Sequence, residues 1–298
     1  MSTEIARVVV IGAGRMGAGI AQVAASAGFH VTAIDSASEQ LAVAREVIAR
    51  DLSKHVSAGK LGADDAETIM GRLTFSSDLA EAAASADFVI EAVSEDISVK
   101  CKLFRELVAL TGGGSIIATN TSSLSITEIA AASGRPRNVI GMHFFNPPTR
   151  MRLVEVIRGL ETSNETAEST VALAKRMGKE TVEVNDSPAF VVSRINAVIG
   201  NEAFRILAEG VATAETIDRA VKLGLNHPMG PFELGDLVGW DVRLSVLRYM
   251  EETLGDAYRA SPLLVQYAKA GRLGRKSGRG VYAYDDRPTD SGLGDRNG

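Results

Sequence analysis

Cysteine is nearly absent from this chain of 298 residues: Cys101 stands alone, so no internal disulfide can form. Apolar runs are short as well, and none approaches the roughly 20 residues that span a bilayer. The start of the chain lacks both the basic region and the cleavage site of a signal peptide. Together these absences favour a reducing compartment, and we expect a cytoplasmic protein with no membrane partner.

A surplus of positive charge is also missing, because 37 acidic residues outnumber 32 basic ones and the net charge is −5. This balance argues against nucleic acid as a partner. The sequence shows no internal repeat and no cluster of zinc ligands, so we expect no metal. The composition is that of an ordinary globular protein, and the length has room for about two domains.

The first motif follows an apolar run at residues 8–11. It reads Gly12-Ala13-Gly14-Arg15-Met16-Gly17, and a helical pattern, a second apolar run at 31–34 and Asp35 come after it. This order predicts a Rossmann-type dinucleotide site, in which Gly12 allows a tight turn, Gly14 lets the backbone approach a pyrophosphate and Gly17 permits close packing of the helix. We expect the loop, Met16 included, to contact the cofactor at the helix N-terminus.

Asp35 selects between the two dinucleotides. A 2′-phosphate would face its carboxylate, and like charges about 4 Å apart repel by up to about 4 kcal/mol at an effective dielectric of 20. Residues 36–38 supply no arginine to reverse that sign. We therefore predict that the cofactor is NAD, with its adenosine ribose bonded to Asp35.

Further apolar runs predict more strands of the same sheet, at 73–75, 88–90, 115–118 and 138–141. Ligands of such sheets collect beyond the carboxyl ends of the strands. Three polar segments fall at such ends: 91–95, 120–123 and 142–148. We expect these segments to form one crevice.

Two helical segments, 38–56 and 63–71, follow the second strand and exceed what a simple crossover needs. They predict an arm over the substrate site, on which Ser53, Lys54 and Lys60 are candidate substrate contacts. The alternative is a solvated helix face.

The α/β pattern stops near Asp186. Asp186-Ser187-Pro188 has the form of a capped helix start, and helical patterns fill the rest of the chain. We predict an NAD-binding domain at 1–186, an all-α domain at 187–285 and a disordered tail at 286–298. The apolar surplus of the helical domain suggests a subunit interface.

The candidate catalytic centre is the stretch Gly141 to Pro148, which contains His143. Histidine is the residue type whose ordinary pKa lies near neutrality, and Ser122 and Glu155 lie at short sequence distances on either side. The alternatives are core packing for His143 and, for Glu155, an ion pair with Arg152 or Arg158.

Taken together, these motifs resemble the L-3-hydroxyacyl-CoA dehydrogenases, and within them the bacterial 3-hydroxybutyryl-CoA dehydrogenases. The likeness covers nearly the whole chain and includes FVIEAVSED, ATNTSSLSITEIA, HFFNPP, LVEVI, HPMGPFEL and GRKSGRGVYAY. HFFNPP and HPMGPFEL are specific to the acyl-CoA group, whereas the glycine loop would fit many unrelated enzymes. The fold expected above, a doubly wound α/β domain followed by an all-α domain, is also that of the family.

The resemblance implies roles for individual residues. His143 matches the catalytic histidine, Glu155 the carboxylate paired with it, and Ser122 a serine that contacts both the substrate hydroxyl and the cofactor. Other matching positions touch the NAD: Glu95, Lys100 and Lys276, with Asn120 in the loop of Ser122. The chain departs from the family at Ser193, where an asparagine is usual in the active site, and at Ala58, where a basic residue of the arm is usual.

The reaction that this resemblance implies is oxidation of (S)-3-hydroxyacyl-CoA to 3-oxoacyl-CoA by NAD, and the reverse, in fatty acid metabolism. His143 would be the general base on the C3 hydroxyl, with Glu155 fixing its tautomer. The resemblance also implies a homodimer through the helical domain. Two alternatives stay open: a sugar-acid dehydrogenase acting on gulonate, and a non-enzymatic NAD-binding protein like the crystallins derived from this fold.

Overall fold

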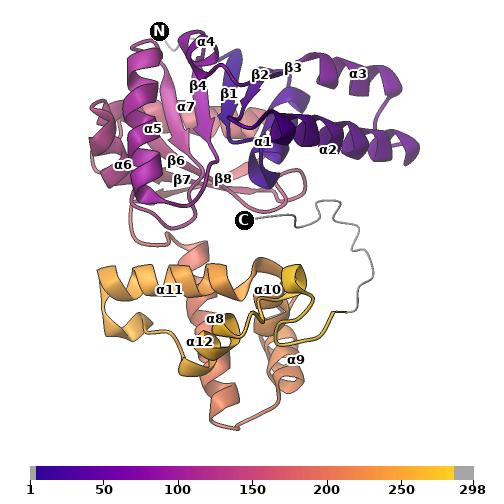
Figure 1. The fold of residues 1–298 in the computed structure, drawn as a ribbon, viewed down its shortest axis with the longest axis vertical. Coiled ribbons are helices and arrows are strands. Elements are labelled where there is room, and N and C mark those ends of the chain that lie inside the picture. Colours follow the sequence, from indigo (N-terminus) through magenta and orange to yellow (C-terminus); the bar gives the residue numbers. More distant parts are fainter. Residues whose placement is uncertain (1–4, 285–298) are drawn as a thin grey trace. The chain divides into compact units, whose positions relative to one another are not determined.

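A computed structural model describes residues 5–284, and the chain divides into two units after Ser187. The first unit holds one β-sheet with helices, and the second is helical (Figure 1). The predicted fold class, a Rossmann-type α/β domain followed by an all-α domain, is therefore confirmed. The predicted tail at 286–298 lies outside the described residues. Among the helices described, none combines the length and the apolar character needed to cross a membrane.

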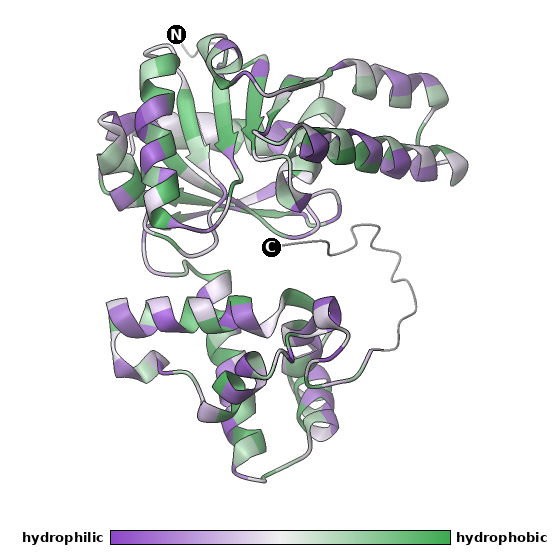
Figure 2. Cartoon of the chain, in the orientation of Figure 1, coloured by the Kyte–Doolittle hydropathy of each residue, from purple (hydrophilic) through white to green (hydrophobic). Residues whose placement is uncertain are grey.

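The sheet of the first unit has eight strands in the order β3-β2-β1-β4-β5-β6-β7-β8. Neighbouring strands are parallel except β6 and β7, which run antiparallel. The strands in the middle of the sheet are buried along their length and hydrophobic in Figure 2. In chain order the strands are Arg7–Ile11, His30–Ile34, Leu73–Ser76, Phe88–Glu91, Ile116–Thr119, Val139–Phe144, Leu153–Arg158 and Glu180–Asn185.

Helices cover both faces of this sheet. Val8 and Val10 of β1 pack with residues of α1, α2, α3 and α7, whereas Val9 and Ile11 pack with residues of α4, α5 and α6. Because alternate side chains of a strand enter opposite layers, both layers require apolar residues, and the strands read as continuous apolar runs. The seven helices α1 to α7 span Arg15–Ser26, Ser38–Ser57, Ala63–Gly71, Leu79–Ala84, Ile97–Leu110, Ile126–Ser133 and Asn164–Arg176.

The expected helix start at Asp186 is wrong. Ala189 and Phe190 have φ angles of 61° and 51°, in the left-handed region, so helix α8 begins only at Val192. Asp186 instead serves helix α6: its Oδ2 accepts hydrogen bonds from the Thr127 amide at 2.8 Å and from the Ser125 hydroxyl at 2.9 Å. A carboxylate from the end of β8 thus satisfies the open amide groups at the start of a distant helix.

The second unit contains helices α8 to α12, at Val192–Ala208, Ala214–Leu225, Pro231–Val238, Trp240–Leu254 and Pro262–Lys269. Its core is aromatic, with Phe204 in edge contact with both Phe232 and Trp240. Thr213 caps α9 by accepting from the Thr216 amide, and Asn226 ends that helix in the left-handed conformation. Asp218 caps α10 from a buried position by accepting from the amides of Phe232 and Glu233.

Candidate active site

The glycine loop between β1 and α1 has the space that each predicted role requires. Gly12 has a φ of 93°, and a Cβ on Gly17 would lie 1.7 Å from the Gly12 carbonyl oxygen, so neither position accepts a side chain. A Cβ on Gly14 would meet nothing within 4 Å. The backbone at Gly14, which opens α1, is therefore open to a ligand, and the unpaired amide groups of a helix start favour an anion there.

Asp35 is held beside this loop by two backbone amides. Its Oδ2 accepts from Ala13 at 2.8 Å and its Oδ1 from Ala37 at 3.0 Å. A hollow of about 410 Å³ opens here, with Gly12 and Asp35 in its wall together with Ile11, Ile34, Ser36, Ser77, Leu79, Val93, Val99, Lys102, Leu103 and Glu106. An apolar hollow with one fixed carboxylate suits an adenosine whose ribose hydroxyls donate to that carboxylate. The residues of the first unit thus fit NAD.

His143 and Glu155 form a buried pair across two strands. His143 lies in β6 and Glu155 in β7, and the antiparallel register makes them direct partners. His143 Nδ1 lies 2.7 Å from Glu155 Oε2, and the two residues are 6% and 0% exposed. The alternatives for Glu155 do not hold, because Arg152 pairs with Glu180 and Arg158 bonds to Asn164. An ionised carboxylate only accepts hydrogen bonds, so Glu155 favours the tautomer of His143 that carries its hydrogen on Nδ1.

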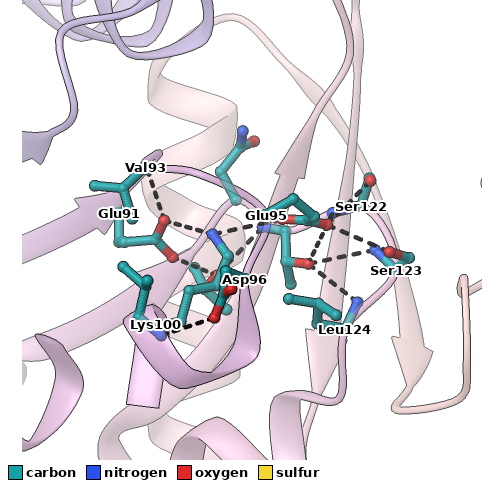
Figure 3. Close-up of polar contacts among 12 residues, drawn as sticks. Glu91, Val93, Glu95, Asp96, Lys100, Ser122, Ser123 and Leu124 are labelled. Carbon is teal, nitrogen blue, oxygen red and sulfur yellow. Dashed lines mark hydrogen bonds and ion pairs between the residues drawn. The ribbon is translucent and has the colours of Figure 1, made fainter. Parts of the chain in front are cut away.

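Asn120 and Ser122 lie in the loop after β5, beside the end of β6. The Asn120 side-chain oxygen accepts from the backbone amide of Phe144, the residue after His143, at 2.8 Å. Glu95, from the segment after β4, holds the next part of the loop: its Oε1 accepts from the Ser122 amide at 2.9 Å and from the Ser122 hydroxyl at 3.2 Å (Figure 3). Polar segments that follow three different strands are thereby brought together, as the sequence predicts.

Two side chains of the site have no assigned role in the sequence-based reasoning. Glu91, the last residue of β4, is fully buried and bonded to Lys100. Lys179 is 8% exposed, and burial lowers its pKa; its Nζ donates to the carbonyls of Pro148 and Met151 and so holds the turn after β6. The sequence could have revealed Glu91, because it is an acidic residue at the last position of an apolar run. It could not have revealed Lys179, which follows a glycine at a helix end and resembles a surface residue.

The remaining predicted residues have less specific surroundings. Ser53 and Lys54 are exposed near the end of α2, and Lys60 is exposed in the connection to α3. Met16 is half-buried in the first turn of α1. Lys100 is 1% exposed, so its predicted contact with NAD stays a prediction.

Two predicted residues belong to the second unit. Ser193 lies in the first turn of α8, and Lys276 Nζ pairs with Asp241 at 2.7 Å. Their predicted roles stay predictions. Within residues 5–284 no group of three or more His, Cys, Asp or Glu side chains is placed to hold a metal ion.

Comparisons with known proteins cover almost the whole chain. Residues 7–187 match the family model described as 3-hydroxyacyl-CoA dehydrogenase, NAD binding domain, and residues 190–284 match the model of the C-terminal domain of the same family. The chain is 48% identical to the "Probable 3-hydroxybutyryl-CoA dehydrogenase" of Bacillus subtilis, over 95% of this chain and 99% of that protein. It is 44% identical to the 3-hydroxybutyryl-CoA dehydrogenase of Bradyrhizobium diazoefficiens, over 95% and 97%. Among solved structures, the (S)-3-hydroxybutyryl-CoA dehydrogenase of Ralstonia eutropha is similar with a TM-score of 0.92 and 41% identity, over 95% of this chain and 100% of that one.

Proposed function

Because the chain belongs to the 3-hydroxyacyl-CoA dehydrogenase family, we propose that it oxidises (S)-3-hydroxybutyryl-CoA to the 3-oxoacyl-CoA with NAD and also runs the reverse reaction. The observation that carries the proposal is the buried pair of His143 and Glu155, 2.7 Å apart, in the unit that also holds the glycine loop and Asp35. A histidine oriented by a buried carboxylate is the arrangement that a general base requires. The NAD-binding part is the domain at 1–186, and the helical domain is 187–285.

Binding of NAD involves residues of the first unit. The backbone of Gly12 to Gly17 and the start of α1 would hold the pyrophosphate, and Asp35 would hold the adenosine ribose. NAD supplies the acceptor for the hydride that leaves C3 of the substrate. Asp35 also excludes a 2′-phosphate by charge repulsion.

His143 performs the proton transfer. Its Nδ1–H donates to Glu155, so Nε2 is the atom that takes the proton of the C3 hydroxyl and returns it in the reverse direction. The buried carboxylate stabilises the imidazolium that forms. The Ser122 hydroxyl orients the substrate oxygen toward Nε2. The resemblance gives Ser193 a further hydrogen bond to the substrate, at a position where it implies an asparagine.

Three further assignments complete the proposal. Ser53, Lys54 and Lys60 lie exposed at the arm, where they contact the CoA part of the substrate. Two residues of α8 are exposed hydrophobic side chains, Ile195 at 54% and Val198 at 42%, which supports a homodimer through the helical domain. The family's reaction and the lone buried cysteine fit a cytoplasmic enzyme. Sedimentation at micromolar concentration tests the dimer, and a monomeric mass would refute it.

The test of the activity measures NADH consumption with acetoacetyl-CoA and NAD reduction with gulonate on the same preparation. We expect turnover of the thioester and none of the sugar acid. His143→Ala should lose at least about a hundredfold in kcat, because general-base catalysis is worth roughly 10²–10⁴, while NADH binding is kept. The matched control is His30→Ala, which removes an exposed histidine at the start of β2.

The alternatives have their own outcomes in this assay. Gulonate oxidation without thioester turnover would favour the sugar-acid dehydrogenase. Tight NADH binding with no turnover of either substrate would favour a non-enzymatic protein. A series of kcat/KM values with 3-hydroxyacyl-CoA substrates from C4 to C16 then gives the preferred length of the acyl chain. We expect the highest kcat/KM with the shortest substrate, C4.

A further inference from the structure

Two oppositely charged side chains are buried beneath the loop that carries Ser122. Glu91 and Lys100 are 0% and 1% exposed, and Lys100 Nζ lies 2.5 Å from Glu91 Oε1 (Figure 3). Charged residues are rarely so buried. Replacing a buried ion pair by apolar residues of similar size is often neutral or stabilising, so stability alone does not account for these charges.

Glu91 is rigidly held at the end of β4. Its Oε1 also accepts from the Val93 amide at 2.7 Å, and its Oε2 accepts from the Thr119 hydroxyl of the neighbouring strand at 2.7 Å. Each carboxylate oxygen therefore has a fixed donor besides Lys100. Because Lys100 comes from the buried side of α5, the ammonium that meets Glu91 has a fixed position as well.

Lys100 in turn faces Glu95, which holds the loop. Lys100 Nζ lies 3.5 Å from Glu95 Oε2, and the other oxygen, Oε1, accepts from the Thr121 hydroxyl at 2.6 Å and from the amide and hydroxyl of Ser122. The Glu95 side chain is 40% exposed. Without the ammonium on one oxygen, a carboxylate with this access to water can turn toward solvent and release the loop.

We propose that Glu91, acting through Lys100 and Glu95, is a positioning residue that fixes the place of the Ser122 hydroxyl. The inference rests on the proposed function, in which Ser122 orients the substrate oxygen. A displacement of about 1 Å at a reacting centre can cost roughly a hundredfold in rate. The buried carboxylate of Glu91 therefore affects the turnover rate through Lys100 and Glu95, although it does not touch the substrate.

Two variants and one control separate positioning from folding. Glu91→Gln keeps the shape and the acceptor for Lys100 but removes the charge, so the ammonium is drawn toward Glu95 and pulls that carboxylate away from the Thr121 and Ser122 groups that it holds. Glu91→Gln/Lys100→Met buries no unpaired charge and serves if the single variant does not fold. The control is Asp87→Asn. Asp87 immediately precedes β4 and accepts hydrogen bonds from the amides of Ala6 and Arg7, so it lies at the opposite end of that strand from Glu91.

The first measurement needs no substrate. Hydrogen exchange of the peptide covering residues 120–124 reports the Ser122 amide, whose bond to Glu95 is the end of the chain of contacts. We expect exchange at least about tenfold faster in both variants and unchanged in Asp87→Asn, since opening of this loop exposes the amide. Unchanged exchange in a folded double variant would overturn the proposal, whatever the substrate of the enzyme is.

The second measurement compares kcat for acetoacetyl-CoA reduction with the dissociation constant of NADH. Positioning predicts that kcat falls 10- to 100-fold, by the geometric argument above, while the dissociation constant stays within about threefold. A kcat within threefold of wild type would overturn the proposal. A loss of NADH affinity as large as the loss of kcat would also overturn it, because Lys100 would then act on the cofactor. Absence of turnover in the wild-type protein would instead reject the proposed function, and the exchange result would still decide whether Glu91 holds the loop.

Discussion

Replacing Glu155 by glutamine removes one charge from the buried pair while keeping its shape. In the wild-type chain, His143 Nδ1 lies 2.7 Å from Glu155 Oε2. The amide oxygen of the new side chain can still accept a hydrogen bond from that nitrogen. What is lost is the attraction between a carboxylate and the imidazolium that forms when His143 takes the substrate proton. The variant therefore isolates the electrostatic part of the interaction.

The size of the effect follows from distance and burial. Charge centres in such a contact are about 4 Å apart, which gives up to about 4 kcal/mol at an effective dielectric of 20. Since neither residue is more than 6% exposed, solvent screens little of it. A loss of about 2–4 kcal/mol slows the reaction roughly 30- to 1,000-fold, at 1.36 kcal/mol for each factor of ten.

The assay follows NADH formation from (S)-3-hydroxybutyryl-CoA at saturating NAD, with NADH binding measured separately by fluorescence. We expect the loss in kcat and an unchanged dissociation constant for NADH. Glu183→Gln is the matched control, because it makes the same substitution at an exposed position of β8, the strand that pairs with β7. A kcat for Glu155→Gln within threefold of wild type, or an equal loss in the control, would refute the reasoning.

Three other outcomes are expected. Gly17→Ala should lower the melting temperature, because its Cβ would lie 1.7 Å from a backbone oxygen. Gly14→Ala should keep the melting temperature and lose NADH affinity, because its Cβ would fill the open space expected for the cofactor. Calorimetry and NADH titration distinguish the two variants, and equal melting temperatures would contradict this prediction. The wild-type kcat/KM should favour NADH over NADPH by up to about a thousandfold, from repulsion of up to about 4 kcal/mol at Asp35, and Asp35→Ala should narrow the ratio. Burial raises the pKa of Asp218, so the folded chain binds its proton more readily than the unfolded chain, and the free energy of unfolding should rise as pH falls through that raised pKa toward the ordinary value of an aspartate. Urea unfolding of wild type and Asp218→Asn at several pH values tests this, since an equal pH slope in both would exclude it.

The sequence was informative where one local pattern determines the structure. Strands buried on both faces appear as apolar runs, and the glycines of the loop after β1 stand where backbone contacts leave no room for a side chain. The predicted partnership of His143 and Glu155 rested on resemblance, and the structure brings the two side chains together through strand pairing.

Other features depend on contacts that no local pattern contains. Asp186 looks like a cap for the helix that follows it, but its acceptor serves an amide 59 residues earlier in the chain. The resemblance implies a contact between Lys100 and NAD, and nothing in the sequence around Lys100 shows that its ammonium is buried against Glu91 of β4. The direction of β7 is equally nonlocal, because a strand of five or six apolar and charged residues pairs in either orientation.

The antiparallel pairing of β6 and β7 has a consequence for how this family can diversify. His143 and Glu155 face each other because of strand register, and a slip of β7 by one residue would turn Glu155 to the other face of the sheet and separate the pair. The register of β7 does not depend on residues 145–152 alone, because β7 is paired with β8 on its other side as well as with β6. An insertion in this segment therefore leaves the pairing of His143 with Glu155 in place, so a descendant protein can vary the loop while it keeps the buried pair.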